Sequence, residues 1–185
     1  MIGQRYPGLG THLDRVTQLA VACADELALP AEQILSIERA AQLYDIGKVA
    51  LPAAILTKNG ALTEEEDEFM RRHSVIGERL LTGIDNLAPV AAIVRATHER
   101  WDGDGYPDQL AGDDIPIGAR IIAVADAFCA MTSDRDGAPA RSITEALAEL
   151  DRRAGRQFDP GVVAVISDIV RRGLEAQKLT LPVST

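Results

Sequence analysis

Residues 11–29 read THLDRVTQLAVACADELAL, and this stretch decides the expected fold class. Its apolar residues recur at steps of three and four positions, which is the spacing of an amphipathic α-helix. The stripe consists of Leu13, Val16, Leu19, Ala20, Cys23 and Leu27. Aromatic residues make up only 4% of the chain, which Ala, Leu, Ile and Val dominate, so the composition favours helices packed on helices.

Further helices are expected along the rest of the chain. Pro30 suits the first position of a helix that runs to Asp45, and Thr63–Glu66 matches a capping box that opens a helix carrying His73. Turn-forming residues predict loops at 51–60, 101–107 and 134–141. Other helices are predicted at about 87–100, at 118–131, after Ser142 and from Asp159. The chain is therefore expected to be an all-α bundle of about seven helices.

The composition limits the class of protein. A chain of 185 residues with 46% hydrophobic content is long enough for one domain, expected at 11–176 between a lead-in at 1–10 and a flexible tail at 177–185. The net charge of −9 argues against binding to polymeric nucleic acid. No long apolar run or signal peptide is found, so we expect a cytoplasmic protein without a membrane partner.

The chain has only three histidines, and each falls on a different predicted helix. Two aspartates accompany them, because Asp45 ends an apolar helix and Asp126 is embedded in an apolar one. Imidazoles and carboxylates from separate helices are the ligands expected of zinc, iron or manganese in a helical bundle. The spacing alone leaves the plainer alternative open, that His12, His73 and His98 are structural hydrogen-bonding residues.

The motifs themselves resemble a known family. Tyr44-Asp45-Ile46-Gly47-Lys48, followed by residues 98–107 with the sequence HERWDGDGYP, is similar to the signature of the HD-GYP family. These proteins are cyclic di-GMP phosphodiesterases of the HD metal-dependent phosphohydrolase superfamily. Residues 125–128 and 132–135 extend the match in the family's order. The resemblance covers roughly His12 to Val170.

The resemblance implies a helical bundle around a two- or three-metal centre, commonly iron or manganese, that hydrolyses cyclic di-GMP or a related small phosphodiester. The positions that match metal ligands are His12, Asp45, His73, His98 and Asp126, with Asp45 as the bridging carboxylate. Lys48 matches a lysine beside the phosphodiester, and Arg135 matches a phosphate-contacting arginine. Gly105, Tyr106 and Pro107 match the loop that borders the guanine end of the ligand. The implied reaction is metal-assisted hydrolysis, with Asp45 and Lys48 as catalytic residues.

Several positions depart from the family pattern. Tyr44 stands where the family has the histidine of its His-Asp pair, and Thr97 replaces one of two adjacent histidines. No acidic residue precedes His12 in the stretch 8–10, and residues 136–138 lack the family's further cationic contact. These losses weaken metal and substrate binding, so the expected number of divalent metals is two, one or none.

Two functions remain open from the sequence. The chain is either a phosphodiesterase with weakened activity, or a non-catalytic module that binds cyclic di-GMP or a signalling-protein partner. We expect Tyr44 to fill the space of the missing histidine, with its hydroxyl bonded to Asp126 or water. Glu99 and Arg100 are expected to form local charge pairs on a solvated helix end, and Arg71 and Arg72 to be surface residues.

Overall fold

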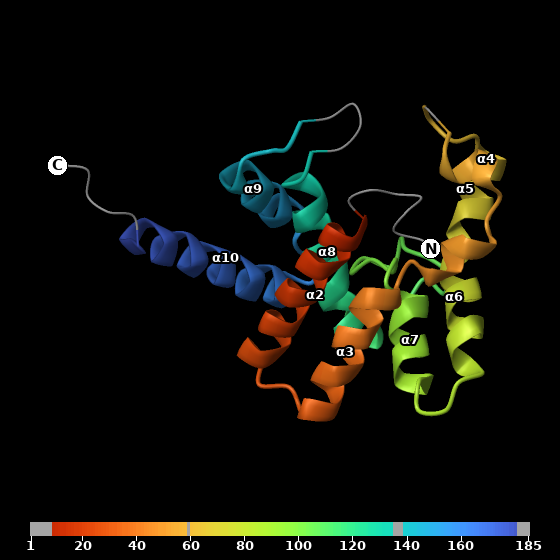
Figure 1. Cartoon of the computed structure of the whole chain (residues 1–185), viewed down its shortest axis with the longest axis horizontal. Coiled ribbons are helices and arrows are strands. Elements are labelled where there is room, and N and C mark those ends of the chain that lie inside the picture. Colours follow the sequence, from red (N-terminus) through yellow and green to blue (C-terminus); the bar gives the residue numbers. More distant parts are fainter. Residues whose placement is uncertain (1–8, 59, 135–138, 181–185) are drawn as a thin grey trace.

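The chain folds as a bundle of α-helices (Figure 1). The computed structural model describes residues 9–58, 60–134 and 139–180, and no β-strand occurs within these ranges. This architecture confirms the predicted all-α class. None of the helices in the described ranges is long and apolar enough to cross a membrane.

The centre of the bundle is built from α2 (Leu9–Glu26), α3 (Ala31–Leu43) and α8 (Ile117–Met131), with α2 packed against both others. The predicted stripe of α2 is inside, because Val16, Ala20 and Cys23 are fully buried. Helix α8 buries Ile121 and Val124 completely. The packing of these apolar faces positions Asp45, which follows α3, and Asp126, which lies in α8.

The region predicted as one helix, opened by the capping box and carrying His73, is in fact two helices. The capping box of Thr63 and Glu66 opens α5 (Glu64–Arg71), as expected. The helix is then interrupted at Arg72, and α6 (His73–Thr82) begins with His73. Short helices also occupy the segment before it: the 3₁₀-helix η1 (Ile46–Ala50), and α4 (Ala53–Leu56) within the predicted loop.

Helix α7 (Ala88–Ala96) ends earlier than the predicted boundary near Arg100, so His98 lies in the turn that follows the helix. An irregular stretch continues to η2 (Gly112–Asp114) and α8. The Ser142 capping box is confirmed at α9 (Ile143–Arg153). Helix α10 (Pro160–Thr180) projects from the bundle and runs past the expected tail boundary at 177 (Figure 1). Residues 181–185 lie outside the described ranges.

Candidate metal centre

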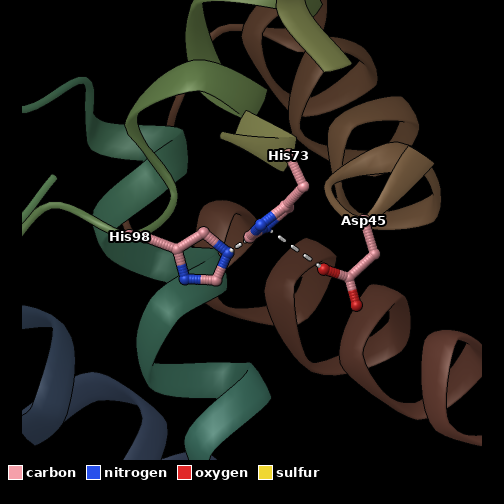
Figure 2. Close-up of side chains that lie close together, drawn as sticks. All are labelled: Asp45, His73 and His98. Carbon is pink, nitrogen blue, oxygen red and sulfur yellow. Dashed lines mark hydrogen bonds and ion pairs between the residues drawn. The ribbon is translucent and has the colours of Figure 1, made fainter. Parts of the chain in front are cut away.

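Three of the predicted ligands come together in one group. Asp45 lies between α3 and η1, His73 opens α6, and His98 follows α7; each offers one ligand atom within 4.8 Å of the others. Figure 2 shows the His73 side chain between the other two. His73 Nε2 is 2.9 Å from His98 Nε2 and 3.6 Å from Asp45 Oδ1. We call these three residues the Asp-His-His group.

The two oxygens of Asp45 have different surroundings. Oδ2 accepts a hydrogen bond of 2.7 Å from the Lys48 ammonium. Oδ1 is buried and has no hydrogen-bond partner among the described residues. A buried carboxylate oxygen without a partner is costly unless a cation meets it. Because Oδ1 lies beside two imidazoles, the Asp-His-His group fits a divalent cation in both charge and ligand type.

Both histidines of the group are suited to act as neutral ligands. Burial lowers the pKa of His73, and burial together with the neighbouring His73 lowers the pKa of His98 to about 4. The His73 Nδ1–H donates to the Met70 carbonyl over 2.6 Å, which leaves the lone pair of the neutral ring on Nε2. The backbone of α5 therefore orients the His73 nitrogen toward Asp45 and His98.

The other two predicted ligands form a second group with Tyr44. His12 Nε2 lies 2.8 Å from Asp126 Oδ1, and the Tyr44 hydroxyl donates to the same oxygen over 3.0 Å. These two hydrogen bonds hold the pKa of Asp126 below its usual range even though burial raises it. Of the two partners expected for the Tyr44 hydroxyl, Asp126 or water, the structure thus has Asp126. His12, Tyr44 and Asp126 are called the His12 group below.

Thr97 does not take over the ligand role of the histidine that the family has at its position. Its side chain is buried, and the hydroxyl donates to the Ile93 carbonyl over 2.9 Å. The hydroxyl is thereby directed to the helix backbone. Arg135, the predicted phosphate contact, lies outside the described residues.

The Gly105–Pro107 loop lies directly over the Asp-His-His group. The ring of Tyr106 stacks on His98, with centroids 5.1 Å apart and planes 10° from parallel. Gly105 is in close contact with the preceding backbone, since a Cβ at this position would come within 2.4 Å of the backbone nitrogen of Arg100. The predicted ligand loop therefore borders the predicted metal ligands.

Glu99 anchors this loop, and the expectation that it forms a charge pair on a solvated helix end is wrong. Its side chain is only 5% exposed, and its two oxygens accept backbone N–H groups of Asp108 and Leu110 at 2.7 and 3.1 Å. Burial raises the pKa of Glu99, while these backbone donors act against that rise. The local pair expected for Arg100 does form, with Asp102.

A cavity of about 520 Å³ adjoins both groups. Its lining includes His98 from one group and Asp126 from the other, together with Tyr106, Arg71, Arg100 and Gln157. This volume is in the range of pockets that hold small-molecule ligands. Arg71 is at the surface as expected, with 52% of its side chain exposed, but its guanidinium also lies 5.1 Å from the centre of the Tyr106 ring, a contact that the sequence did not predict.

A helical bundle that gathers an aspartate and two histidines beside a cavity has the ligand types of a metal site. The family model described as "HD domain" matches residues 1–162, and the chain belongs to that family. A cyclic di-GMP phosphodiesterase response regulator of Xanthomonas campestris, RpfG, is 44% identical over 164 residues, covering 88% of this chain and 43% of its own. A cyclic di-GMP phosphodiesterase of Thermotoga maritima is 39% identical over 170 residues, covering 87% and 46%.

Solved structures agree on the fold. A cyclic GMP-AMP-specific phosphodiesterase of V. cholerae superposes with a TM-score of 0.71 at 20% identity, over 92% of this chain and 46% of its own. The HD domain of the L. monocytogenes phosphodiesterase PgpH, in complex with cyclic-di-AMP, superposes with a TM-score of 0.65 at 19% identity, over 95% and 94%. The chain spans less than half the length of the two curated relatives described above.

Proposed function

We propose that this chain is a metal-dependent phosphodiesterase domain that hydrolyses cyclic di-GMP. The observation that carries the proposal is Asp45 Oδ1, which is buried beside His73 and His98 and has no hydrogen-bond partner among the described residues. His98 also lines a cavity together with Gly105 and Tyr106. The relatives named as cyclic di-GMP phosphodiesterases support the choice of substrate.

The Asp-His-His group would hold the cation, for which we propose iron or manganese because mixed imidazole and carboxylate ligands suit both. When bound, such a cation supplies Lewis acidity at the phosphoryl group and lowers the pKa of a water molecule. Only three protein ligands come from this group, which leaves coordination positions for water and substrate. The site is therefore built for catalysis and not for a closed structural ion.

The remaining side chains orient the ligands and add charge. Lys48 donates to Asp45 Oδ2, so it fixes the carboxylate and places a positive charge where a phosphate oxygen would approach. Tyr44 and His12 fix Asp126 in the same way. Because Tyr44 is a weak ligand at neutral pH, we propose that the Asp-His-His group binds its metal more tightly than the His12 group does.

Metal analysis tests the proposal directly. We expect about one iron or manganese per chain after anaerobic purification with the metal supplied, together with hydrolysis of cyclic di-GMP. His98→Ala should lose both, because two protein ligands hold a divalent ion poorly. Tyr44→Phe is the matched control, since it keeps all three ligands of the Asp-His-His group and should retain the metal. A wild-type metal content below about 0.2 per chain would refute a metal-dependent function.

The second candidate is a non-catalytic module that binds cyclic di-GMP and signals to a partner protein. The hydrogen bond from Tyr44 to Asp126 favours it, because this bond engages one of the predicted ligands without a metal. Binding of cyclic di-GMP by the metal-free chain, with no hydrolysis at any metal content, would support this candidate. Release of pGpG or GMP by the metal-loaded chain would exclude it.

A further inference from the structure

Arg71 connects the cavity to the loop over the metal centre. It is the last residue of α5 and lines the cavity with His98 and Tyr106. Its guanidinium lies over the face of Tyr106, and Tyr106 in turn stacks on His98. A cation over an aromatic ring is held in place by the ring's electrostatic field. The position of Arg71 therefore depends on the same ring that borders the Asp-His-His group.

The Arg71 side chain is 52% exposed, and its hydrogen-bond donors are only partly used by other side chains. Its Nε donates to Asp67 Oδ2 over 2.8 Å, while no acceptor for its two terminal nitrogens is found among the described residues. Arg100, which also lines the cavity, differs in this respect because its Nε and one terminal nitrogen both donate to Asp102. Asp67 thus holds the Arg71 side chain at one nitrogen and leaves two donor groups for a ligand at the cavity.

The chemistry of those donors suits guanine. An arginine presents two N–H groups in a fixed planar fork, and guanine presents two acceptors, O6 and N7, on one edge. Adenine has a donor, the N6 amino group, where guanine has O6, so the same arginine meets a mismatch. Tyr106 adds no charge, because burial raises the pKa of its phenol to about 12. The ring next to Arg71 is therefore a neutral stacking surface.

A phosphate contact is the competing role for an arginine in this cavity. The phosphate that reacts has to lie beside the Asp-His-His group. The Lys48 ammonium, which donates to Asp45, already supplies a positive charge there. Arg71 instead packs on Tyr106 and pairs with Asp67. The aromatic contact and the unused planar donors are better matched to a base than to the reacting phosphate.

We propose that Arg71 determines specificity by reading the O6/N7 edge of a guanine in the bound cyclic dinucleotide. This inference rests on the proposed function, since it assumes that a cyclic dinucleotide occupies the cavity. It goes further by assigning base recognition to a residue on α5, outside the Gly105–Pro107 loop. Its consequence is that the chain prefers guanine over adenine ligands through Arg71.

The test compares two dinucleotides and two neighbouring arginines. Binding of hydrolysis-resistant phosphorothioate analogues of cyclic di-GMP and cyclic di-AMP to the manganese-loaded chain would be measured by calorimetry. Arg71→Ala should weaken cyclic di-GMP binding by about 10- to 100-fold and cyclic di-AMP binding by less than about threefold. Arg71→Lys should lose the same preference, because an ammonium cannot form the planar fork.

Arg72→Ala is the matched control. Arg72 pairs with Glu68, lies over Phe69 and is absent from the cavity lining, so its removal should leave both affinities unchanged. If Arg71→Ala lowered the affinity for both dinucleotides equally, Arg71 would contact a phosphate, and the inference would be overturned. Unchanged cyclic di-GMP binding in that variant would also overturn it while the proposed function stands. If the wild-type chain bound neither analogue, the proposed function itself would fail, and the inference with it.

Discussion

Glu99 illustrates how one buried carboxylate can hold a loop in place. Its two oxygens accept backbone N–H groups from Asp108 and Leu110, on the far side of the Gly105–Pro107 loop. The loop is thereby closed back onto the segment that carries His98. Because Tyr106 is part of this loop and stacks on His98, Glu99 is a positioning residue for the cavity.

We predict that Glu99→Gln loosens the loop without changing its size. A glutamine has one carbonyl oxygen, so its NH₂ group would face one of the two backbone donors and leave it unsatisfied. The expected cost is about 1–3 kcal/mol in the free energy of unfolding, with weaker cyclic di-GMP binding. Urea denaturation and calorimetry would measure these effects. Glu65→Gln, at an exposed position on α5, should change stability by less than about 0.5 kcal/mol.

Residue roles followed from the sequence only where a motif or a chemical mismatch pointed to them. Tyr44 stood out because a phenol occupies the position of a family ligand, and Asp126 is one of the two partners that were expected for its hydroxyl. Glu99 and Arg71 gave no such signal. The contacts of Glu99 depend on a loop that folds back over 9 to 11 residues, and the contact of Arg71 depends on α5 meeting that loop. Periodicity carries no information on either contact.

The packing of η1 against α6 sets the distance between Asp45 and His73. Gly47 lies at this contact, and a Cβ on it would come within 1.9 Å of the His73 carbonyl oxygen and 2.7 Å of the Gly77 nitrogen. Both atoms belong to the backbone of α6, which cannot move aside as a flexible side chain would. The two elements therefore approach this closely only because residue 47 has no side chain.

We predict that Gly47→Ala separates η1 from α6 and disrupts the metal centre. Overpacking at a backbone contact costs about 1–3 kcal/mol, and the shift would move Asp45 away from His73. Both the free energy of unfolding and the metal content should fall. Gly83→Ala is the control, because a Cβ at that position has no neighbour within 4 Å and the backbone has φ −78°. Full metal content in Gly47→Ala would contradict this account of the spacing.

At the level of elements, the sequence predicted the well-patterned helices and missed a break. The apolar residues of α2 and α8 were correctly predicted to lie in the core, because each helix has a continuous apolar face. The break between α5 and α6 was missed because Arg72 keeps helical dihedral angles, φ −65° and ψ −16°. The apolar spacing thus passes through the interruption almost unchanged, so the pattern gives no sign that one helix ends at Arg71 and the next begins at His73.

At the scale of the whole molecule, the Asp-His-His group joins segments that are distant in sequence. Asp45 follows α3, His73 starts α6 and His98 follows α7, so the three ligand atoms meet only when these helices are packed together. The unfolded chain lacks this geometry. A cation bound here therefore stabilises the folded state as a whole, and its effect should appear in global unfolding.

We predict that manganese raises the unfolding temperature of the metal-free chain. At a metal concentration about 100 times the dissociation constant, mass action contributes about 2.7 kcal/mol, which for a domain of this size corresponds to roughly 5–10 °C. Differential scanning fluorimetry after EDTA treatment would measure the shift. His73→Ala should abolish it, whereas Tyr44→Phe should preserve it, because the hydroxyl of Tyr44 contacts Asp126 in the His12 group. Loss of the shift in Tyr44→Phe alone would instead place the tighter metal in the His12 group.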